Sequence, residues 1–265
     1  LLARGERVRV VVRSADQGKA WADRGAEVAV ADLGDRAAVA RALGGVDGAY
    51  LLVPPVFAAA DPIAAGTAVA TALADAAAEA GIRHVVLLSS VGAEHPTGTG
   101  PIRILHAAEG LLRARGVPTT ALRASYFLEN WGSVSAVAKS DGVLPMFVAA
   151  NRPLPQVATR DIGEAAATLL VEGPPAGGFR TVGLAGPTDW TPTEIAAELG
   201  RLFGRTVTPA ESPLSAAIPA LTAAGLPPAW AALYAELYAG VADGKVAFPN
   251  GPDRRGTTTA SGVFG

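Results

Sequence analysis

The chain has 265 residues, half of them apolar, and a formal net charge of −2. That near-neutral charge provides no basic field for nucleic acid, and the absence of cysteine excludes disulfides, thiolate nucleophiles and cysteine-ligated zinc. The lack of cysteine fits a cytoplasmic protein, no apolar run approaches the roughly 20 residues of a membrane span, and we expect no metal site.

Strands and helices are expected to alternate strictly through the first half of the chain. Short apolar runs predict strands at residues 8–12, 27–31, 47–53, 83–90 and 118–124. The runs between them predict helices at residues 16–24, 35–43, 61–80 and 101–115. Such alternation predicts a Rossmann-type α/β fold, with a doubly wound parallel sheet.

The pattern changes in the second half of the chain. Residues 191–194 carry the capping-box spacing of a helix start. An Ala/Leu-rich helical stretch is expected over residues 213–242, and the tail from Pro249 is expected to be irregular. We therefore predict a dinucleotide-binding domain, residues 1–130, and a smaller substrate-binding cap, residues 131–265, that shares the same sheet.

Polar residues collect just after the carboxyl ends of the predicted strands, where open α/β sheets bind ligands. Arg13 and Ser14 follow the first of these strands, and no acidic residue stands beside them. An acidic side chain here binds the ribose of NAD, whereas arginine suits the 2′-phosphate of NADP. We therefore predict NADP as the cofactor; the alternative is a solvated arginine at a strand end.

The next two strands also end in candidate cofactor-binding residues. Asp32 can accept a hydrogen bond from an adenine amino group while Leu33 packs on the ring, although an ordinary turn or helix cap is an equal alternative. Val53, Pro54 and Pro55 end the third strand, where proline removes backbone donors and fixes φ. These three residues form a stiff edge for a flat ligand, or they simply stop the strand.

Ser89 and Ser90 end the fourth strand, and a hydroxyl there can orient a substrate or a cofactor. They do not form a hydrolase nucleophile elbow, because Leu88 stands where that motif needs glycine. His106, on the following helix, can donate a proton or bind a ribose hydroxyl, and Glu109 three residues later can orient it. The alternative is a half-exposed histidine paired with Glu109.

The fifth strand runs into the aromatic turn RASYFLEN. We assign Ser125, Tyr126 and Phe127 to the cofactor site, where the rings can wall a nicotinamide. Asn130 and Phe127 are assigned to the substrate. The alternative is a cluster that packs the cap against the first domain, and both roles can hold.

These segments together resemble the NmrA-like, atypical branch of the short-chain dehydrogenase/reductase superfamily, from residue 1 to about residue 203. The resemblance rests on VVLLSS, on HxxE followed by LL, on LRxxYFLEN, and on the later ATRDIGEAAATLL and GPTDWTPTEIAAEL. It implies an NADP(H) site formed by Arg13, Asp32, Leu33, Val53, Pro54, Ser89, Ser90, Ser125, Tyr126 and Phe127.

The resemblance implies an NAD(P)H-dependent oxidoreductase that reduces a small planar acceptor, such as a quinone or an azo compound, with His106 as the catalytic residue. The Tyr-x-x-x-Lys pair of active short-chain dehydrogenases is absent, since Ile102 stands four residues before His106. This departure keeps open a non-catalytic NADP(H)-binding sensor and, less favoured, an epimerase-like relative. The expected partners are a small-molecule substrate and either a second copy of the chain or a regulatory protein.

The family also begins with a strand and a G-x-x-G-x-x-G loop, which no segment here matches. That strand is central in the fold, so its absence leaves two rows of buried backbone groups unpaired between the strands at residues 8–12 and 47–53. We therefore expect the natural protein to be longer at its front, and residues 1–265 alone to bind NADPH weakly and to have low stability.

Overall fold

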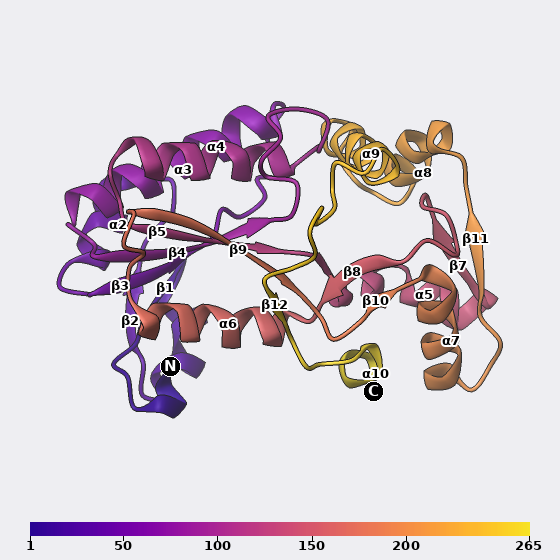
Figure 1. Cartoon of the computed structure of the whole chain (residues 1–265), viewed down its shortest axis with the longest axis horizontal. Helices are drawn as coiled ribbons and strands as arrows, with labels where there is room; N and C mark the ends of the chain where they lie inside the picture. The colour runs from indigo at the N-terminus through magenta and orange to yellow at the C-terminus, as the bar shows by residue number, and fades with distance from the viewer.

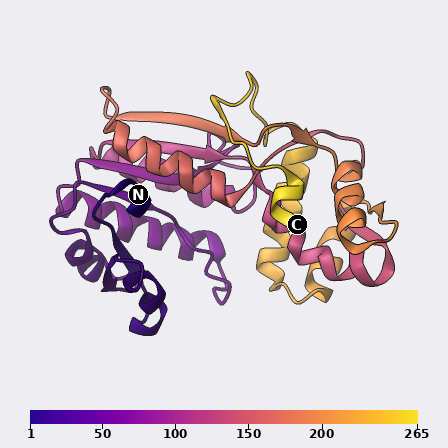
Figure 2. The same cartoon turned by 90° about the horizontal axis from the view of Figure 1, so that it is seen from below.

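A five-stranded parallel sheet forms the centre of the molecule. The computed structural model, which describes residues 1–265, orders this sheet β12-β9-β5-β4-β3. The strands are β3 (Gly48–Leu51), β4 (His84–Ser90), β5 (Thr119–Ala124), β9 (Phe179–Ala185) and β12 (Arg254–Arg255). Helices α3 (Pro62–Glu79) and α4 (Ile102–Ala114) cover one face, and α6 (Thr159–Glu172) covers the other (Figure 1, Figure 2). The expected doubly wound α/β fold is confirmed.

The sheet is buried because its strands are apolar and helices cover both faces. Val85, Val86 and Leu122 are fully buried at its centre. Small residues let the helices lie close together: a Cβ added at Gly66 of α3 would meet the Ile104 side chain of α4 at 2.6 Å. Substitution of this glycine therefore forces the Ile104 side chain, or the two helices, to shift.

The ends of α3 follow from local sequence. Asp61 caps the helix, since its carboxylate accepts a hydrogen bond from the Ala64 amide, and Pro62 occupies the first turn. Gly81 follows the helix with φ of 63°, a conformation that favours glycine. Neither α3 nor any other helix is both long enough and apolar enough to cross a membrane.

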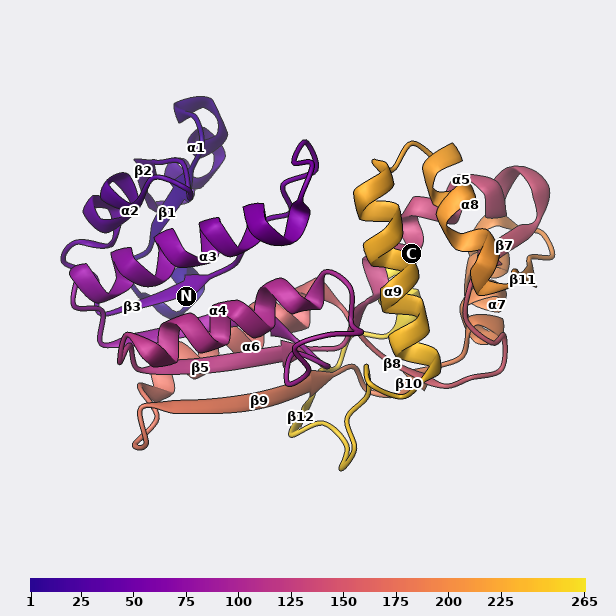
Figure 3. The ribbon, with the colours of Figure 1, turned by 90° about the horizontal axis from the view of Figure 1, so that it is seen from above.

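The first two strands form a separate sheet. The strands β1 (Arg9–Val12) and β2 (Glu27–Val30) pair in parallel, after a short 3₁₀ helix η1 (Leu2–Arg4) and together with α1 (Ala15–Ala22) and α2 (Arg36–Leu43). β1 is bonded only to β2, and β3 only to β4, so each has one free edge. The interruption between β1 and β3 is where the resemblance places the first strand of the family. This unit and the helices of the cap lie at opposite ends of the molecule (Figure 3).

The cap is built from short strands and helices around its own core. The 3₁₀ helix η2 (Leu128–Trp131) and α5 (Gly132–Asp141) follow β6 (Tyr126–Phe127) in the chain. One small sheet pairs β7 (Val143–Met146) with β11 (Thr208–Glu211), and another pairs β6 with β8 (Leu154–Val157) and β8 with β10 (Asp189–Trp190). The remaining helices are α7 (Pro192–Phe203), η3 (Leu214–Ala216), α8 (Ala217–Ala223), α9 (Pro228–Ala242) and α10 (Ala260–Phe264). The start of α7 has the expected capping box between Thr191 and Glu194.

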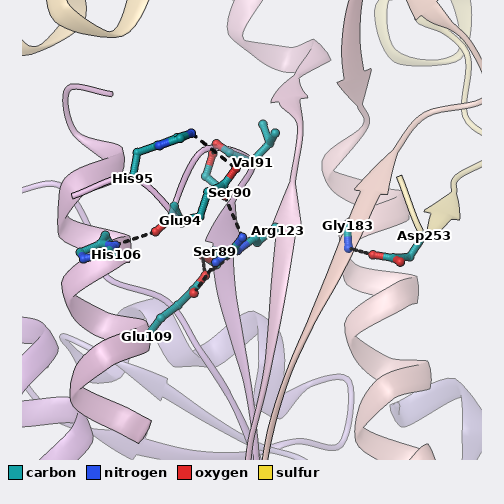
Figure 4. Close-up of polar contacts among 11 residues, drawn as sticks. Ser89, Ser90, Val91, Glu94, His95, His106, Glu109, Arg123, Gly183 and Asp253 are labelled. Carbon is teal, nitrogen blue, oxygen red and sulfur yellow. Dashed lines mark hydrogen bonds and ion pairs between the residues drawn. The ribbon is translucent and has the colours of Figure 1, made fainter. Parts of the chain in front are cut away.

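The tail after Pro249 is irregular only in part, because it contains one short strand and one short helix, and to that extent the expectation of an irregular tail was wrong. Arg254–Arg255 pair with β9 as β12, and the Asp253 carboxylate accepts a hydrogen bond from the Gly183 amide at 2.6 Å (Figure 4). Helix α10 then packs into the core of the cap. These contacts join residues about 70 positions apart, and periodicity within the tail carries no signal of such pairing.

Candidate active site

The carboxyl ends of the central strands lie at the end of the sheet that faces the cap (Figure 1). We call this end of the sheet the sheet edge. The register places Leu51 opposite Leu87 and Ser90 opposite Ala124. The segments that follow β3, β4 and β5 therefore lie along one edge, as parallel pairing requires. Arg13 and Asp32 lie at the equivalent ends of β1 and β2, which form the separate sheet.

Arg13 presents an exposed guanidinium that forms no hydrogen bond or ion pair with the rest of the chain. Only its backbone amide is engaged, donating to Gln17 Oε1 at 3.2 Å. Ser14 is also exposed; it stands at the N-cap position of α1, and its hydroxyl caps no backbone amide. Both side chains are therefore free to bind an anion.

Asp32 lies in a turn, as the plainer of the two alternatives predicts. Its Oδ1 accepts a hydrogen bond from the Gly34 amide at 2.8 Å, while Asp35 supplies the cap of α2. Leu33 packs against the core beneath α2 and α3 instead of standing free to cover a ring. Asp32 is exposed and its carboxylate keeps acceptor capacity, and Leu33 is half-buried, so adenine contacts of this pair stay a prediction.

The segment after β3 is held by the cap. Val53 packs against the core, Pro54 is half-buried and Pro55 is exposed. The carbonyl oxygen of Val56 accepts a hydrogen bond from Trp230 Nε1 at 3.3 Å, so α9 fixes the end of this proline edge.

Ser89 belongs to a closed polar network beneath the sheet edge (Figure 4). Its hydroxyl donates to Glu109 Oε1 at 2.6 Å, and Arg123 donates from Nε and Nη2 to the two Glu109 oxygens at 3.0 and 2.8 Å. Ser89 and Glu109 are 2% and 3% exposed. The Ser89 proton is therefore committed to Glu109, so this hydroxyl could meet a ligand only as an acceptor, and its role in orienting one stays a prediction. Ser90 donates to the Val91 carbonyl at 3.0 Å.

Arg123 stays charged in this network. Burial alone would lower its pKa, but the Glu109 carboxylate and then Glu94 outweigh burial and raise the pKa above its ordinary value. The remaining nitrogen, Nη1, donates to Glu94 Oε2 at 2.7 Å. Arg123 thus joins β5, α4 and the loop after β4.

His106 does not pair with Glu109, so the expected contact along the helix was wrong. Glu109 turns toward Arg123 and Ser89, while His106 Nδ1 donates to the Ala93 carbonyl at 2.8 Å (Figure 4). A carbonyl is only an acceptor, so Nδ1 carries the proton and Nε2 of the neutral ring is an acceptor. This tautomer suits a bond from a ribose hydroxyl better than donation of a proton.

The turn after β5 holds an unpaired buried hydroxyl. Ser125 is 3% exposed, and its Oγ has no hydrogen-bond partner. Such groups are rare, because leaving one unpaired costs about 1–3 kcal/mol. Phe127 packs against the core shared by β4, β5 and α6, whereas Asn130 is exposed. Ser125 is therefore the residue of this turn whose buried hydroxyl is free to bond a ligand.

Sequence reasoning missed two tyrosines on α9. Tyr234 and Tyr238 lie one turn apart on that helix, and burial raises the pKa of both, that of Tyr238 to about 12. Burial, and then the charges that Tyr238 and Tyr234 can carry, also raise the pKa of Tyr126, so the three phenols lie within electrostatic range of one another. Trp230, Tyr234 and Tyr238 recur every fourth residue, and this spacing was the available signal.

No three His, Cys, Asp or Glu side chains are grouped so that they could hold a metal ion. The candidate site thus contains the residues at the strand ends, His106 with its Nδ1 bonded to a backbone carbonyl, and aromatic side chains from the cap.

Known proteins resemble this chain in fold and in sequence. An NADPH-dependent quinone oxidoreductase from Escherichia coli, solved as a complex with NADPH, superposes with a TM-score of 0.83 at 26% identity, over 99% of this chain and 92% of that one. A (4-alkanoyl-5-oxo-2,5-dihydrofuran-3-yl)methyl phosphate reductase of Streptomyces griseus is 34% identical over 77% of this chain and 68% of its own length. An NAD(P)H azoreductase of Xenophilus azovorans is 26% identical over 87% of this chain and 77% of its own length.

The expected family resemblance is confirmed by a match that spans most of the chain. The sequence model of the NmrA-like family covers residues 1–227, from β1 and its free arginine through the polar network of α4 to the first helices of the cap. The chain therefore belongs to the NmrA-like family.

Proposed function

We propose that the protein is an NADPH-dependent oxidoreductase that reduces a small planar acceptor, such as a quinone or an azo compound. Three relatives whose names describe reductases, one of them solved with NADPH, support this function. The observation that carries the proposal is the unpaired, buried Ser125 hydroxyl at the carboxyl end of the central strand β5. That is the place where sheets of this kind bind a cofactor.

The residues at the strand ends fit a nicotinamide dinucleotide. NADPH, when bound, supplies the hydride for the reduction, and the chain supplies position and electrostatics. Arg13 would hold the 2′-phosphate with its forked donors, and His106 Nε2 would accept a hydrogen bond from a ribose hydroxyl. Ser125 Oγ would donate to the nicotinamide carboxamide or to the acceptor, and the edge formed by Pro54 and Pro55 would keep the rings in place.

We also propose that a further strand, which carries the phosphate-binding glycine loop, pairs with β1 and β3 in the natural protein. The support for this strand is the free edge that each of them has. A strand in that position satisfies two rows of backbone groups and joins the two sheets into one.

A non-catalytic NADP(H) sensor is the alternative, and one observation favours it. His106 is tied through Nδ1 to a backbone carbonyl, so its neutral ring has no proton to donate from Nε2. The exposed Leu214 and Ile218, in the segment 213–242, would then contribute to the surface that docks a regulatory protein.

Consumption of NADPH separates the two functions. The chain extended by the proposed strand and glycine loop is mixed with NADPH and a panel of quinones and azo dyes, and absorbance at 340 nm is followed. The oxidoreductase consumes NADPH only when an acceptor is present. A protein that binds NADPH, yet consumes none with any acceptor, is a sensor.

A further inference from the structure

Three of the four tyrosines gather at the sheet edge that faces the cap. Tyr126 comes from the turn after β5, while Tyr234 and Tyr238 come from one face of α9. All three residues are half-buried. We call these three residues the tyrosine face.

Other aromatic rings surround the tyrosine face. Trp230 lies 6.3 Å from Tyr234 between ring centroids, and Phe147 lies 5.3 Å from Tyr238. Trp131 contacts Tyr126 edge-on at 5.8 Å. The chain is only 6% aromatic, so this concentration of rings marks a surface suited to flat, unsaturated molecules.

Helix α9 is held rigidly against the loop after β4. The backbone of this loop touches the helix directly, because a Cβ added at Gly100 would overlap the Leu233 carbonyl oxygen. Glu236 accepts a hydrogen bond from the Gly98 amide at 2.7 Å and pairs with Arg103 at 3.4 Å. The tyrosine face is therefore placed by fixed elements, as a binding surface requires.

The hydroxyls of Tyr234 and Tyr238 are free. Neither forms a hydrogen bond with another group of the chain, and neither is among the fully buried polar atoms. Burial keeps the pKa of Tyr238 near 12 and raises that of Tyr234, so both remain neutral donors at physiological pH. A neutral phenol donates a hydrogen bond to an oxygen that gains negative charge.

We propose that the tyrosine face is the acceptor subsite: its rings pack on a planar aromatic acceptor, and the hydroxyls of Tyr234 and Tyr238 donate hydrogen bonds to the acceptor atom that becomes negative. This inference rests on the proposed function. For a quinone, the reaction balances with one hydride (two electrons and one proton), which bound NADPH would supply in becoming NADP⁺, and one further proton from solvent, to give the hydroquinone. The phenols stabilise the negative oxygen before it is protonated and are themselves unchanged.

Binding of 1,4-naphthoquinone to the full chain without NADPH tests the subsite. Quenching of tryptophan fluorescence reports the affinity, because Trp230 and Trp131 adjoin the tyrosine face. The double variant Tyr234→Phe/Tyr238→Phe keeps both rings and removes both hydroxyls. We expect its affinity for the quinone to fall about tenfold or more, since each lost hydrogen bond weakens binding several-fold. The matched control is Tyr50→Phe, on β3, which should bind as the wild type does.

A second measurement separates hydroxyls from rings. Tyr234→Leu keeps an apolar side chain but removes the flat ring, so it should weaken naphthoquinone binding more than Tyr234→Phe does. Thermal unfolding of each variant shows whether the fold is kept. In turnover assays, Tyr234→Phe and the double variant Tyr234→Phe/Tyr238→Phe should have a lower kcat with the quinone than the wild type. Their Kd for NADPH should be unchanged.

Unchanged naphthoquinone binding and unchanged kcat in the folded double Phe variant would overturn the subsite. Failure of the proposed function has a different signature, because it is the absence of NADPH consumption with every acceptor. The binding titration needs no NADPH, so it decides the role of the tyrosine face in either case.

Discussion

Two groups of side chains at the same sheet edge differ in how completely their hydrogen-bonding capacity is used. In the network of Ser89, Glu109 and Arg123, each charged group has its partners and little surface is exposed. On the tyrosine face, the rings are half-buried and two hydroxyls are free. The first group belongs to the scaffold, and the second is open to a ligand.

This difference reverses what the motifs indicate. The network carries the segments that are easiest to recognise, VVLLSS and HxxE, yet its polar atoms are already satisfied by one another. The tyrosines of α9 stand in a generic Ala/Leu-rich stretch without a motif. A recognisable motif can therefore mark what holds a site in place, while the groups that meet the ligand lie elsewhere.

Disruption of the network of Ser89, Glu109 and Arg123 should lower the stability of the fold more than any other change proposed here. Arg123→Met leaves the buried Glu109 carboxylate without its partner, so we expect the free energy of unfolding to fall by about 3–5 kcal/mol. Urea unfolding measures it. The control is Arg83→Met, which removes an exposed pair with Asp47 and should cost less than about 1 kcal/mol. Equal losses in the two variants would show that the network is not a special support of the scaffold.

Arg13, at the other end of the proposed cofactor site, has an exposed guanidinium without a partner in the chain. Arg13→Glu places a negative charge where the 2′-phosphate would lie, so kcat/KM for NADPH should fall about 100-fold, and that for NADH much less. Arg7→Glu, with an equally exposed arginine just before β1, is the charge-matched control. An equal fall for both cofactors, or in both variants, would contradict the assignment of Arg13 to the phosphate.

His106 shares features of both groups. Its Nδ1 is hydrogen-bonded to the Ala93 carbonyl, and its Nε2 has no partner. If Nε2 binds a ribose hydroxyl, His106→Ala should weaken NADPH binding about tenfold and leave kcat within about threefold. His106→Asn can still donate to the Ala93 carbonyl but has no acceptor in place of Nε2, so it should lose as much NADPH affinity as His106→Ala does. A loss in kcat of about 100-fold or more with unchanged NADPH affinity would instead identify a proton donor.

The smallest effect is expected where the tail joins the sheet. Arg254, and then Arg180, hold the pKa of Glu172 below its ordinary value. Since the pKa is lowered in the folded state, the stabilisation is present at neutral pH and is lost as pH falls through and below the usual carboxyl range. Amide exchange of Arg254–Arg255, corrected for intrinsic rates, should accelerate about two- to threefold there. In Glu172→Gln, exchange that still responds to acid in the same way would rule out this cause.

The fold was predictable where signals are local. Asp61, Pro62 and Gly81 define the ends of α3 through their own backbone preferences, and alternation of strands and helices defines the parallel sheet. Strand β12 was missed, because it depends on an Asp253–Gly183 contact between distant segments. No sequence pattern within the tail indicates that Asp253 would contact Gly183.

The site was predictable as a set of positions but not as a set of contacts. Parallel pairing places Ser89 and Ser125 at strand ends, and sequence cannot tell which hydroxyl stays free. Glu109 has a neighbour on its own helix, His106, and a stronger one across the sheet, Arg123, and only the tertiary structure selects the second. The direction of Tyr234 likewise depends on how α9 docks against the glycines of another loop.

The most direct test of the oxidoreductase function is an anaerobic reaction of the full chain with NADPH and 1,4-naphthoquinone. Absorbance at 340 nm counts the NADPH consumed, and chromatography counts the hydroquinone formed. The proposed function predicts one hydroquinone for each NADPH consumed, with turnover lowered in Tyr234→Phe/Tyr238→Phe and kept in Tyr50→Phe. NADPH that is bound but never consumed, with any quinone in excess, would contradict it.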